Sequence, residues 1–233
     1  MANYVNHKNK WAFIHIPKTS GGRISAELEE IPYTELIDET HGGFRNFPKL
    51  NNYFVFAFVR NPFFRFISGY LHYNRDFLSG TNDTERFNQL SNKESNRIYC
   101  DIYQKYIQYN LPLPLGDFIK LVNIIPLGTF MSQTQSELIY QDNLFHNQVN
   151  YVAKYENREN ELRFISKKIK YDLNQLSEFT DNMQLYSEGI PTLHHNSLKL
   201  ESQYSKFYTD QWMIDWVVEY YKDDFKNFEY NTN

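Results

Sequence analysis

Residues 13–24 read FIHIPKTSGGRI, and they determine the kind of fold that the rest of the chain has to complete. The apolar run that ends here, WAFIHI (11–16), has β-formers at both ends and predicts a short buried strand. A loop over residues 17–22 follows, and GRISAELEE then has the composition of a helix. This order predicts an anion site, because a helix N-terminus presents backbone N–H groups and a positive dipole end.

The loop contains the residues that a phosphate needs, but not in the order of the usual phosphate loop. Gly21 and Gly22 let the backbone approach a ligand closely, and Lys18 supplies a mobile positive charge. A Walker loop needs G-x-x-x-x-G-K-[ST], in which the lysine follows the glycines. Here the lysine precedes them, so the loop predicts a phosphate site that is not that of an ordinary nucleotide triphosphatase. The alternative is a tight turn with a surface lysine.

A second strand, loop and helix follow further along the chain. YFVFAFV (53–59) is almost entirely β-branched or aromatic and predicts a central strand. In RNPFFRFIS, which comes next, Asn61 is a good N-cap and Pro62 suits the first helical position. Arg60 stands at the carboxyl end of the strand, where open α/β sheets bind their ligands. A guanidinium from Arg60 and a hydroxyl from Ser68 are suited to hold a phosphate.

Arg65 lies three residues before this serine and has two possible roles. It could contribute to the same anion site, or it could form structural ion pairs, as many buried arginines do. The second role is also an alternative for Arg60.

The remaining pattern predicts an α/β fold with an open parallel sheet flanked by helices. Further strands are predicted at 33–38 and 149–156, and helices at 94–110, 157–170 and 209–225. No internal repeat or linker divides the chain, so one domain is expected over residues 1–233.

The composition limits the classes of function. With 41% hydrophobic residues among 233, the chain predicts a packed globule rather than a disordered tail. A net charge of −4 argues against a broad nucleic-acid footprint. The single cysteine, Cys100, excludes an intramolecular disulfide and cysteine-rich metal sites. No secretory signal or membrane span is visible in the sequence, so a cytoplasmic location is expected.

PKTSGG after one strand and R-x-P-x-x-R-x-x-S-x-Y after another resemble the sulfotransferases that use 3′-phosphoadenosine 5′-phosphosulfate (PAPS). The resemblance is to the carbohydrate-type branch, which includes heparan-sulfate and Golgi-like enzymes and bacterial family 2 proteins, and whose first loop typically reads HIPKTGGTS. The second motif is complete from Arg60 to Tyr70. Similar segments around Glu156 and at the C-terminal end extend the likeness over most of residues 11–230.

The resemblance implies a P-loop-like sulfotransferase domain. Its core would span residues 11–230, with a variable helical insertion at about 76–145, where the likeness is weakest. Members of the family transfer a sulfuryl group from PAPS to a hydroxyl acceptor by in-line displacement, with the aid of a general base. A carbohydrate is the expected acceptor. No metal is needed, because fixed cations and N–H dipoles neutralise the leaving group.

The resemblance also implies roles for individual residues. Lys18 would contact the 5′-phosphosulfate and stabilise charge on the bridging oxygen as the S–O bond breaks. Arg60 and Ser68 would bind the 3′-phosphate, the group that distinguishes PAPS from ATP-like ligands. Backbone N–H groups would hold the 5′-phosphate, and the residues that supply them would be Thr19, Ser20, Gly21, Gly22, Arg23 and Ile24.

The first loop departs from the family pattern at three positions. Ser20 occupies a common glycine position, and Gly22 and Arg23 stand where the family often has threonine and serine. A hydroxyl contact to the phosphate is then missing, and the charge of Arg23 would replace it. These departures leave open the alternative of a catalytically degenerate protein that binds a nucleotide or glycan. A P-loop kinase is a weaker alternative, because neither a Walker lysine nor Mg²⁺ ligands are found.

Transfer to a hydroxyl also needs a base, and histidine is suited to this role near neutral pH. His41 opens HGGFRNF, where carbohydrate-type relatives often place a catalytic histidine. It could instead be an ordinary turn histidine, and Glu39 or Glu35 would then serve if burial raised its pKa. His15, within the first predicted strand, is expected to be a core residue.

Overall fold

The structure, a computed structural model, describes most of the elements that the sequence predicts. The described residues are 3–19, 21–38, 50–78, 101–102, 105–106, 113–124, 133–141, 149–173 and 206–232. The chain divides into two compact units, the first made of Met1–Arg65, Gln133–Thr180 and Tyr221–Asn233, and the second of Phe66–Ser132 and Asp181–Tyr220. One domain over residues 1–233, with an insertion at about 76–145, stays a prediction.

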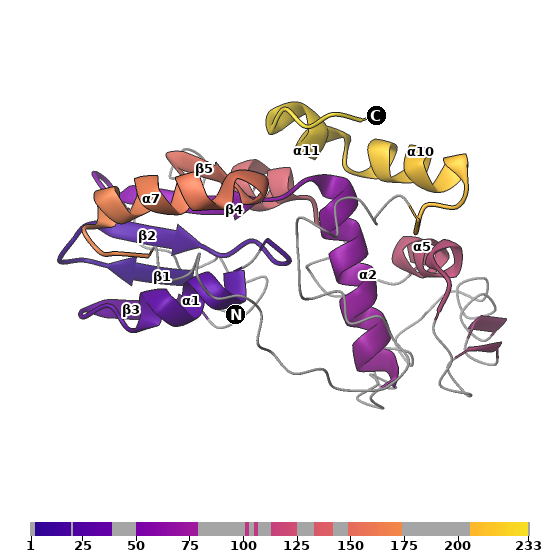
Figure 1. Ribbon diagram of the computed structural model, residues 1–233, viewed down its shortest axis with the longest axis horizontal. Helices are drawn as coiled ribbons and strands as arrows, with labels where there is room; N and C mark the ends of the chain where they lie inside the picture. The colour runs from indigo at the N-terminus through magenta and orange to yellow at the C-terminus, as the bar shows by residue number, and fades with distance from the viewer. Residues whose placement is uncertain are drawn as a thin grey trace. The chain divides into compact units, whose positions relative to one another are not determined.

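The first unit is built on an open sheet of five strands in the order β3-β1-β2-β4-β5 (Figure 1). The strands are β1 (Asn3–Asn6), β2 (Trp11–Ile14), β3 (Thr34–Asp38), β4 (Phe54–Val59) and β5 (Tyr151–Lys154). β2, β4 and β5 are mutually parallel, and β1 pairs antiparallel with both β2 and β3. Four of the five strands confirm the sequence predictions.

The prediction of a wholly parallel sheet was wrong, because β1 lies between β3 and β2 and runs antiparallel to both. A tight turn joins β1 to β2, and in it the Asn9 N–H donates to Asn6 Oδ1 at 2.8 Å. Such a turn can connect antiparallel strands, whereas parallel strands need a longer crossover. The polar composition of β1 did not predict a strand. Its Asn6 is nevertheless fully buried, and the Asn6 Nδ2 donates to Pro32 O at 3.0 Å. The fold is therefore α/β with a mixed sheet.

Side chains alternate between the two faces of the sheet, and each face has its own cover. On one face, α1 (Gly21–Glu29) and α7 (Arg158–Ile169) pack on aromatic residues that include Phe13 and Phe56 (Figure 1). On the other face, small and aliphatic residues of β2 and β4 pack on the short helix η3 (Glu137–Gln141). The segments that follow β2 and β5 thus each lead into a helix that packs on the sheet.

The predicted C-terminal helix is two helices. α10 (Gln211–Tyr220) and α11 (Lys222–Asn227) are separated at Tyr221, whose backbone φ of −107° leaves the helical region. Tyr221 is buried and its ring faces the guanidinium of Arg65, with Cζ 5.9 Å from the ring centroid. The break thus falls at a buried ring, and amphipathic periodicity did not predict it.

The second unit is helical in its described part. α2 (Pro62–Leu78) begins in the first unit and belongs to the second from Phe66 onward. Phe66 packs on Phe118 of α5 (Leu115–Ile124) and on Trp216 of α10, with ring centroids 5.6 and 5.2 Å away. No helix among the described residues is long and apolar enough to cross a membrane. The helix predicted at 94–110 lies largely outside the described residues.

Candidate active site

The carboxyl ends of three parallel strands place the predicted anion-binding residues at one edge of the sheet. In the register of the ladder, Ile14 of β2 pairs with Ala57 of β4, and Val59 of β4 pairs with Lys154 of β5. The segments that follow these strands therefore emerge beside one another. They carry Lys18, Arg60 and Glu156, all within the first unit. This edge is where open α/β sheets bind ligands.

The segment Pro17–Thr19, here called the Lys18 loop, makes a sharp turn between β2 and α1. Lys18 has a φ of 69°, in the left-handed region that costs a non-glycine residue about 1–2 kcal/mol. Thr19 is fully buried, and its Oγ1 donates to Ile16 O at 2.7 Å. The threonine hydroxyl thus stabilises the loop, and only the backbone of Thr19 remains for the predicted phosphate cradle.

Gly21 begins α1 and packs against a buried histidine. A Cβ added at Gly21 would lie 1.6 Å from Cδ2 and 1.7 Å from Nε2 of His15. His15 is 5% exposed, and its backbone N–H donates to Asn3 Oδ1 at 2.8 Å. The prediction that His15 is a core residue is confirmed. Glycine is therefore required at position 21 by its contact with the His15 ring, apart from any approach of a ligand.

The first turn of α1 provides the backbone donors predicted for a phosphate. The first N–H groups of an α-helix have no partner within the helix, and in α1 these belong to Gly21, Gly22, Arg23 and Ile24. No acidic residue lies in this turn to compete with a bound anion. The Ile24 side chain is buried in the core, so only its backbone is available. Ser20 and the Arg23 side chain lie outside the described residues.

Arg65, in the first turn of α2, donates hydrogen bonds that stabilise the Lys18 loop. Its Nε donates to Pro17 O at 3.1 Å and its Nη1 donates to Gln133 O at 3.1 Å. The side chain is 1% exposed. These contacts favour the structural alternative for Arg65, which holds the loop by hydrogen bonds to carbonyl groups.

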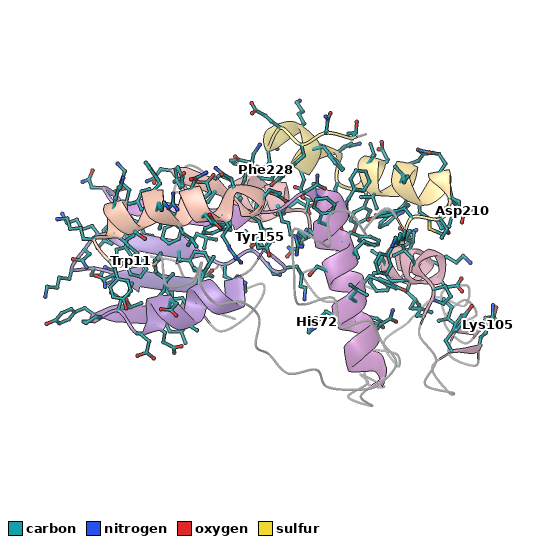
Figure 2. All side chains as sticks on the ribbon, in the orientation of Figure 1. Trp11, His72, Lys105, Tyr155, Asp210 and Phe228 are labelled. Atoms are coloured by element: carbon teal, nitrogen blue, oxygen red, sulfur yellow. The ribbon has the colours of Figure 1, made fainter. Side chains whose placement is uncertain are left out.

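Arg60 is fixed at both its main chain and its head. Its N–H donates to Gln135 Oε1 at 2.8 Å, and Gln135 Nε2 donates to Arg60 O at 2.8 Å. The guanidinium Cζ lies 4.5 Å from the ring centroid of Tyr155, in the turn that follows β5 (Figure 2). At this distance the aromatic face stabilises the cation. Arg60 is 7% exposed, so its charge is held within a largely protein environment.

An acidic residue ties the start of α2 to β5 and to the C-terminal segment. Asn61 Oδ1 accepts from the Phe63 N–H at 3.0 Å, which confirms the predicted cap, and the Asn61 N–H donates to Glu156 Oε1 at 2.7 Å. The Tyr230 hydroxyl donates to Glu156 Oε2 at 2.8 Å. Burial, followed by the charge and the hydrogen bond of Glu156, raises the pKa of Tyr230, while the positive charge of Arg60 opposes the rise. Tyr230 is therefore a neutral donor that fixes the Glu156 carboxylate.

The predicted general base is not among the described residues. His41 and its possible substitute Glu39 both lie outside them. Glu35 is exposed on β3, without the burial that its alternative role required. Ser68 is partly exposed on α2 in the second unit, and its role stays a prediction. Within the described residues no group of three His, Cys, Asp or Glu side chains could hold a metal ion.

Two residues that support Arg60 were missed by the sequence analysis. Gln135 and Asp224 are both fully buried and hydrogen-bonded to each other. One local signal was present in the sequence, since TQSE (134–137) is a capping box that marks the start of a helix. The Thr134 N–H donates to Glu137 Oε2 at 2.6 Å and the Glu137 N–H donates to Thr134 Oγ1 at 3.0 Å. That signal locates a helix start but does not reveal that Gln135 contacts Arg60.

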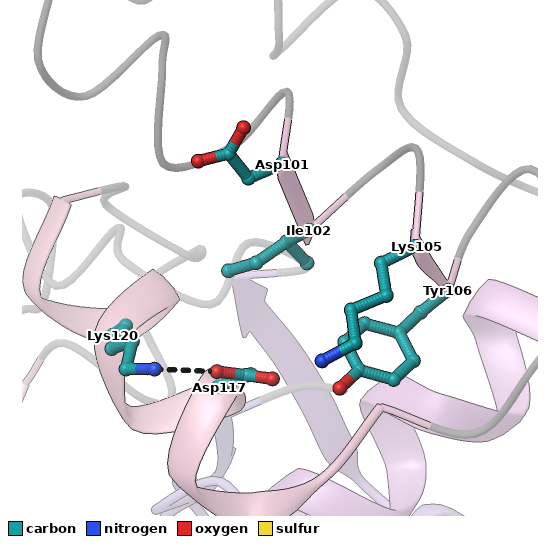
Figure 3. A pocket seen from close by; sticks show the side chains of 6 residues that line it. All are labelled: Asp101, Ile102, Lys105, Tyr106, Asp117 and Lys120. Carbon is teal, nitrogen blue, oxygen red and sulfur yellow. Dashed lines mark hydrogen bonds and ion pairs between the residues drawn. The ribbon is translucent and has the colours of Figure 1, made fainter.

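The second unit contains a separate pocket of about 220 Å³ (Figure 3). Its lining residues are Asp101, Ile102, Lys105, Tyr106, Asp117 and Lys120. Lys120 Nζ lies 2.7 Å from Asp117 Oδ1. Burial raises the pKa of Asp117, but hydrogen bonds from Lys120 and Tyr106, together with the positive charges of Lys120 and Lys105, leave the pKa lowered. The two acidic and two basic residues balance one another, so this pocket lacks the positive excess that a phosphosulfate needs.

Comparison with known proteins identifies the family. Residues 3–231 match the sequence model described as the Sulfotransferase family. No curated protein and no solved structure gives a significant match to the chain. Since the match spans nearly the whole chain, including every segment that contributes to the edge of the sheet described above, the chain belongs to the sulfotransferase family, whose general chemistry is sulfuryl transfer.

Proposed function

We propose that this protein is a PAPS-dependent sulfotransferase that modifies a hydroxyl group of a carbohydrate. The observation that carries the proposal is the placement of Lys18, the start of α1 and Arg60 at the carboxyl ends of adjacent parallel strands. Two separated cationic groups and a helix N-terminus suit a ligand with two separated anionic groups. The match to the family supports the same assignment.

The residues present fit PAPS in their chemistry. Arg60, stacked on Tyr155, is suited to hold the 3′-phosphate, and Ser68 is proposed as a second ligand on the resemblance alone. Backbone N–H groups from Thr19 through Ile24 are proposed to hold the 5′-phosphate. When bound, PAPS supplies the sulfuryl group, and adenosine 3′,5′-bisphosphate is the product.

Lys18 and His41 are proposed as the residues that act in the transfer itself. The Lys18 ammonium would stabilise negative charge on the oxygen that leaves the sulfur. An imidazole nitrogen of His41 would take the proton from the acceptor hydroxyl during in-line attack. The hydrogen bonds that Thr19 and Arg65 donate to Ile16 O and Pro17 O support this role, because they fix the turn that presents the lysine.

The test is transfer of labelled sulfate from PAPS to a panel of hydroxyl-bearing glycans. Lys18→Ala should lower turnover roughly 10²–10³-fold, the usual effect of removing one group that stabilises the leaving oxyanion. Lys10→Ala is the matched control, because Lys10 is exposed in the β1–β2 turn and also has a left-handed φ, of 54°. His41→Ala should keep nucleotide binding and lose rate.

Two outcomes would contradict the proposal in different ways. Equal turnover by the Lys18 and Lys10 variants would exclude the role of Lys18. Nucleotide binding by a folded protein that modifies no acceptor would support the alternative of a degenerate binding protein, which the departures at Ser20, Gly22 and Arg23 leave open.

A further inference from the structure

A buried carboxylate lies behind the 3′-phosphate residue proposed above. Asp224 of α11 is fully buried, and its carboxylate accepts three N–H groups from the segment that precedes η3. Oδ2 accepts from the Gln135 backbone N–H at 3.0 Å and from Gln135 Nε2 at 3.2 Å, and Oδ1 accepts from the Ser136 N–H at 2.6 Å. A buried charge is costly unless its hydrogen bonds are satisfied, so this arrangement strongly favours one placement of Gln135.

Gln135 transmits this placement to Arg60. Its carboxamide accepts from the Arg60 N–H and donates to the Arg60 carbonyl, each at 2.8 Å. Arg60 is the first residue after β4, so the amide continues the hydrogen bonding where the strand ends. The carboxamide of glutamine can make both contacts because it has a donor and an acceptor side by side in one planar group. An apolar residue of the same size could not replace these contacts.

We propose that Gln135, oriented by Asp224, is a positioning residue that gives the site its preference for a nucleotide with a 3′-phosphate. The inference rests on the proposed function. With the main chain of Arg60 paired to Gln135 and its head stacked on Tyr155, the guanidinium keeps one direction before any ligand arrives. A pre-oriented cation binds its anion more tightly, because less conformational freedom is lost on binding.

The test separates positioning from general stability by comparing two nucleotides. Dissociation constants of adenosine 3′,5′-bisphosphate and of AMP are measured by calorimetry for the parent, Gln135→Met and Gln133→Met. Gln133→Met is the matched control, because Gln133 Oε1 is buried without a hydrogen-bond partner among the described residues. A merely structural loss would weaken both nucleotides together, whereas misdirection of Arg60 weakens only the one with the 3′-phosphate.

We expect the parent and Gln133→Met to prefer the bisphosphate roughly 10- to 100-fold, as for hydrogen bonds to a charged group. Gln135→Met should lose most of this preference and bind AMP within about twofold of the parent. If Gln135→Met does not fold, the same two dissociation constants are measured for Asp224→Asn. This variant keeps the shape of the side chain and removes the charge that orients Gln135. It should lower the preference about threefold or more.

Two contrary results would distinguish failure of this inference from failure of the proposed function. A folded Gln135→Met or Asp224→Asn variant with the parent's preference would overturn this inference and leave the proposed function intact. A parent that binds the two nucleotides equally would overturn the proposed function, and this inference with it.

Discussion

Replacing Gly21 with alanine should destabilise this protein, although the same change within most helices is favourable. Gly21 opens α1, and alanine usually stabilises a helix by about 1 kcal/mol relative to glycine. Here the added Cβ would lie 1.6 Å from His15 Cδ2, far inside the optimum of about 3.5–4.0 Å for carbon atoms. The imidazole would therefore have to move by about 2 Å, the difference between these two distances.

The cost follows from the surroundings of this ring. His15 is buried and its ring stacks on Phe13, with centroids 6.1 Å apart. Overpacking of a buried site costs about 3 kcal/mol at the upper end of the usual range. After the gain in helix propensity, Gly21→Ala should lower the free energy of unfolding by about 2 kcal/mol. For a chain of this size that corresponds to a fall in Tm of roughly 4–8 °C.

A double-mutant cycle measured by urea denaturation isolates the contact. His15→Ala removes the ring, so in that background Gly21→Ala should be neutral or stabilising by up to about 1 kcal/mol. The coupling between the two positions should therefore be about 2–3 kcal/mol. If Gly21→Ala has the same effect in both backgrounds, His15 does not pack on Gly21 and the account of this turn is wrong.

Two further predictions concern residues that support the fold. Arg65→Met should lower the free energy of unfolding by about 2–4 kcal/mol, because Pro17 O and Gln133 O lose their donor. Urea denaturation measures this change, and a value below about 0.5 kcal/mol would show that these bonds are absent. Asp117→Asn should cost about 0.5 kcal/mol near pH 7, and this cost should diminish as the pH falls below the ordinary aspartate pKa of 3.8. The sign follows from the lowered pKa of Asp117, whose contribution is present above the unfolded-state pKa and is lost as pH falls through the folded-state value. The control is Asp101→Asn, an exposed residue of the same pocket, and a cost that persists at low pH would contradict the prediction.

Local patterns in the sequence predicted the strands and turns that form the site. The run before Lys18 and the run before Arg60 are strands because β-branched and aromatic residues fill them, and Asn61 caps α2 as its position suggested. These features depend on neighbours in the chain, so sequence alone reveals them.

Long-range contacts explain what the sequence did not predict. β1 was not predicted because two of its four residues are asparagines, which are buried where apolar residues usually mark a strand. Asp224 contacts Gln135 across 89 positions of the chain, and no local pattern connects them. The turn strain at Lys18 and the need for glycine at position 21 likewise depend on side chains brought together only by folding.

The most direct test of the proposed function is calorimetric titration with adenosine 3′,5′-bisphosphate, beside AMP and ATP, without added metal. The bisphosphate should bind at least about tenfold more tightly than AMP or ATP, and Arg60→Ala should abolish this preference. Arg163→Ala, a change at an exposed arginine of α7, should leave it unchanged. Equal binding of the three nucleotides, no binding at all, or a preference that survives Arg60→Ala would contradict a 3′-phosphate site at the end of β4.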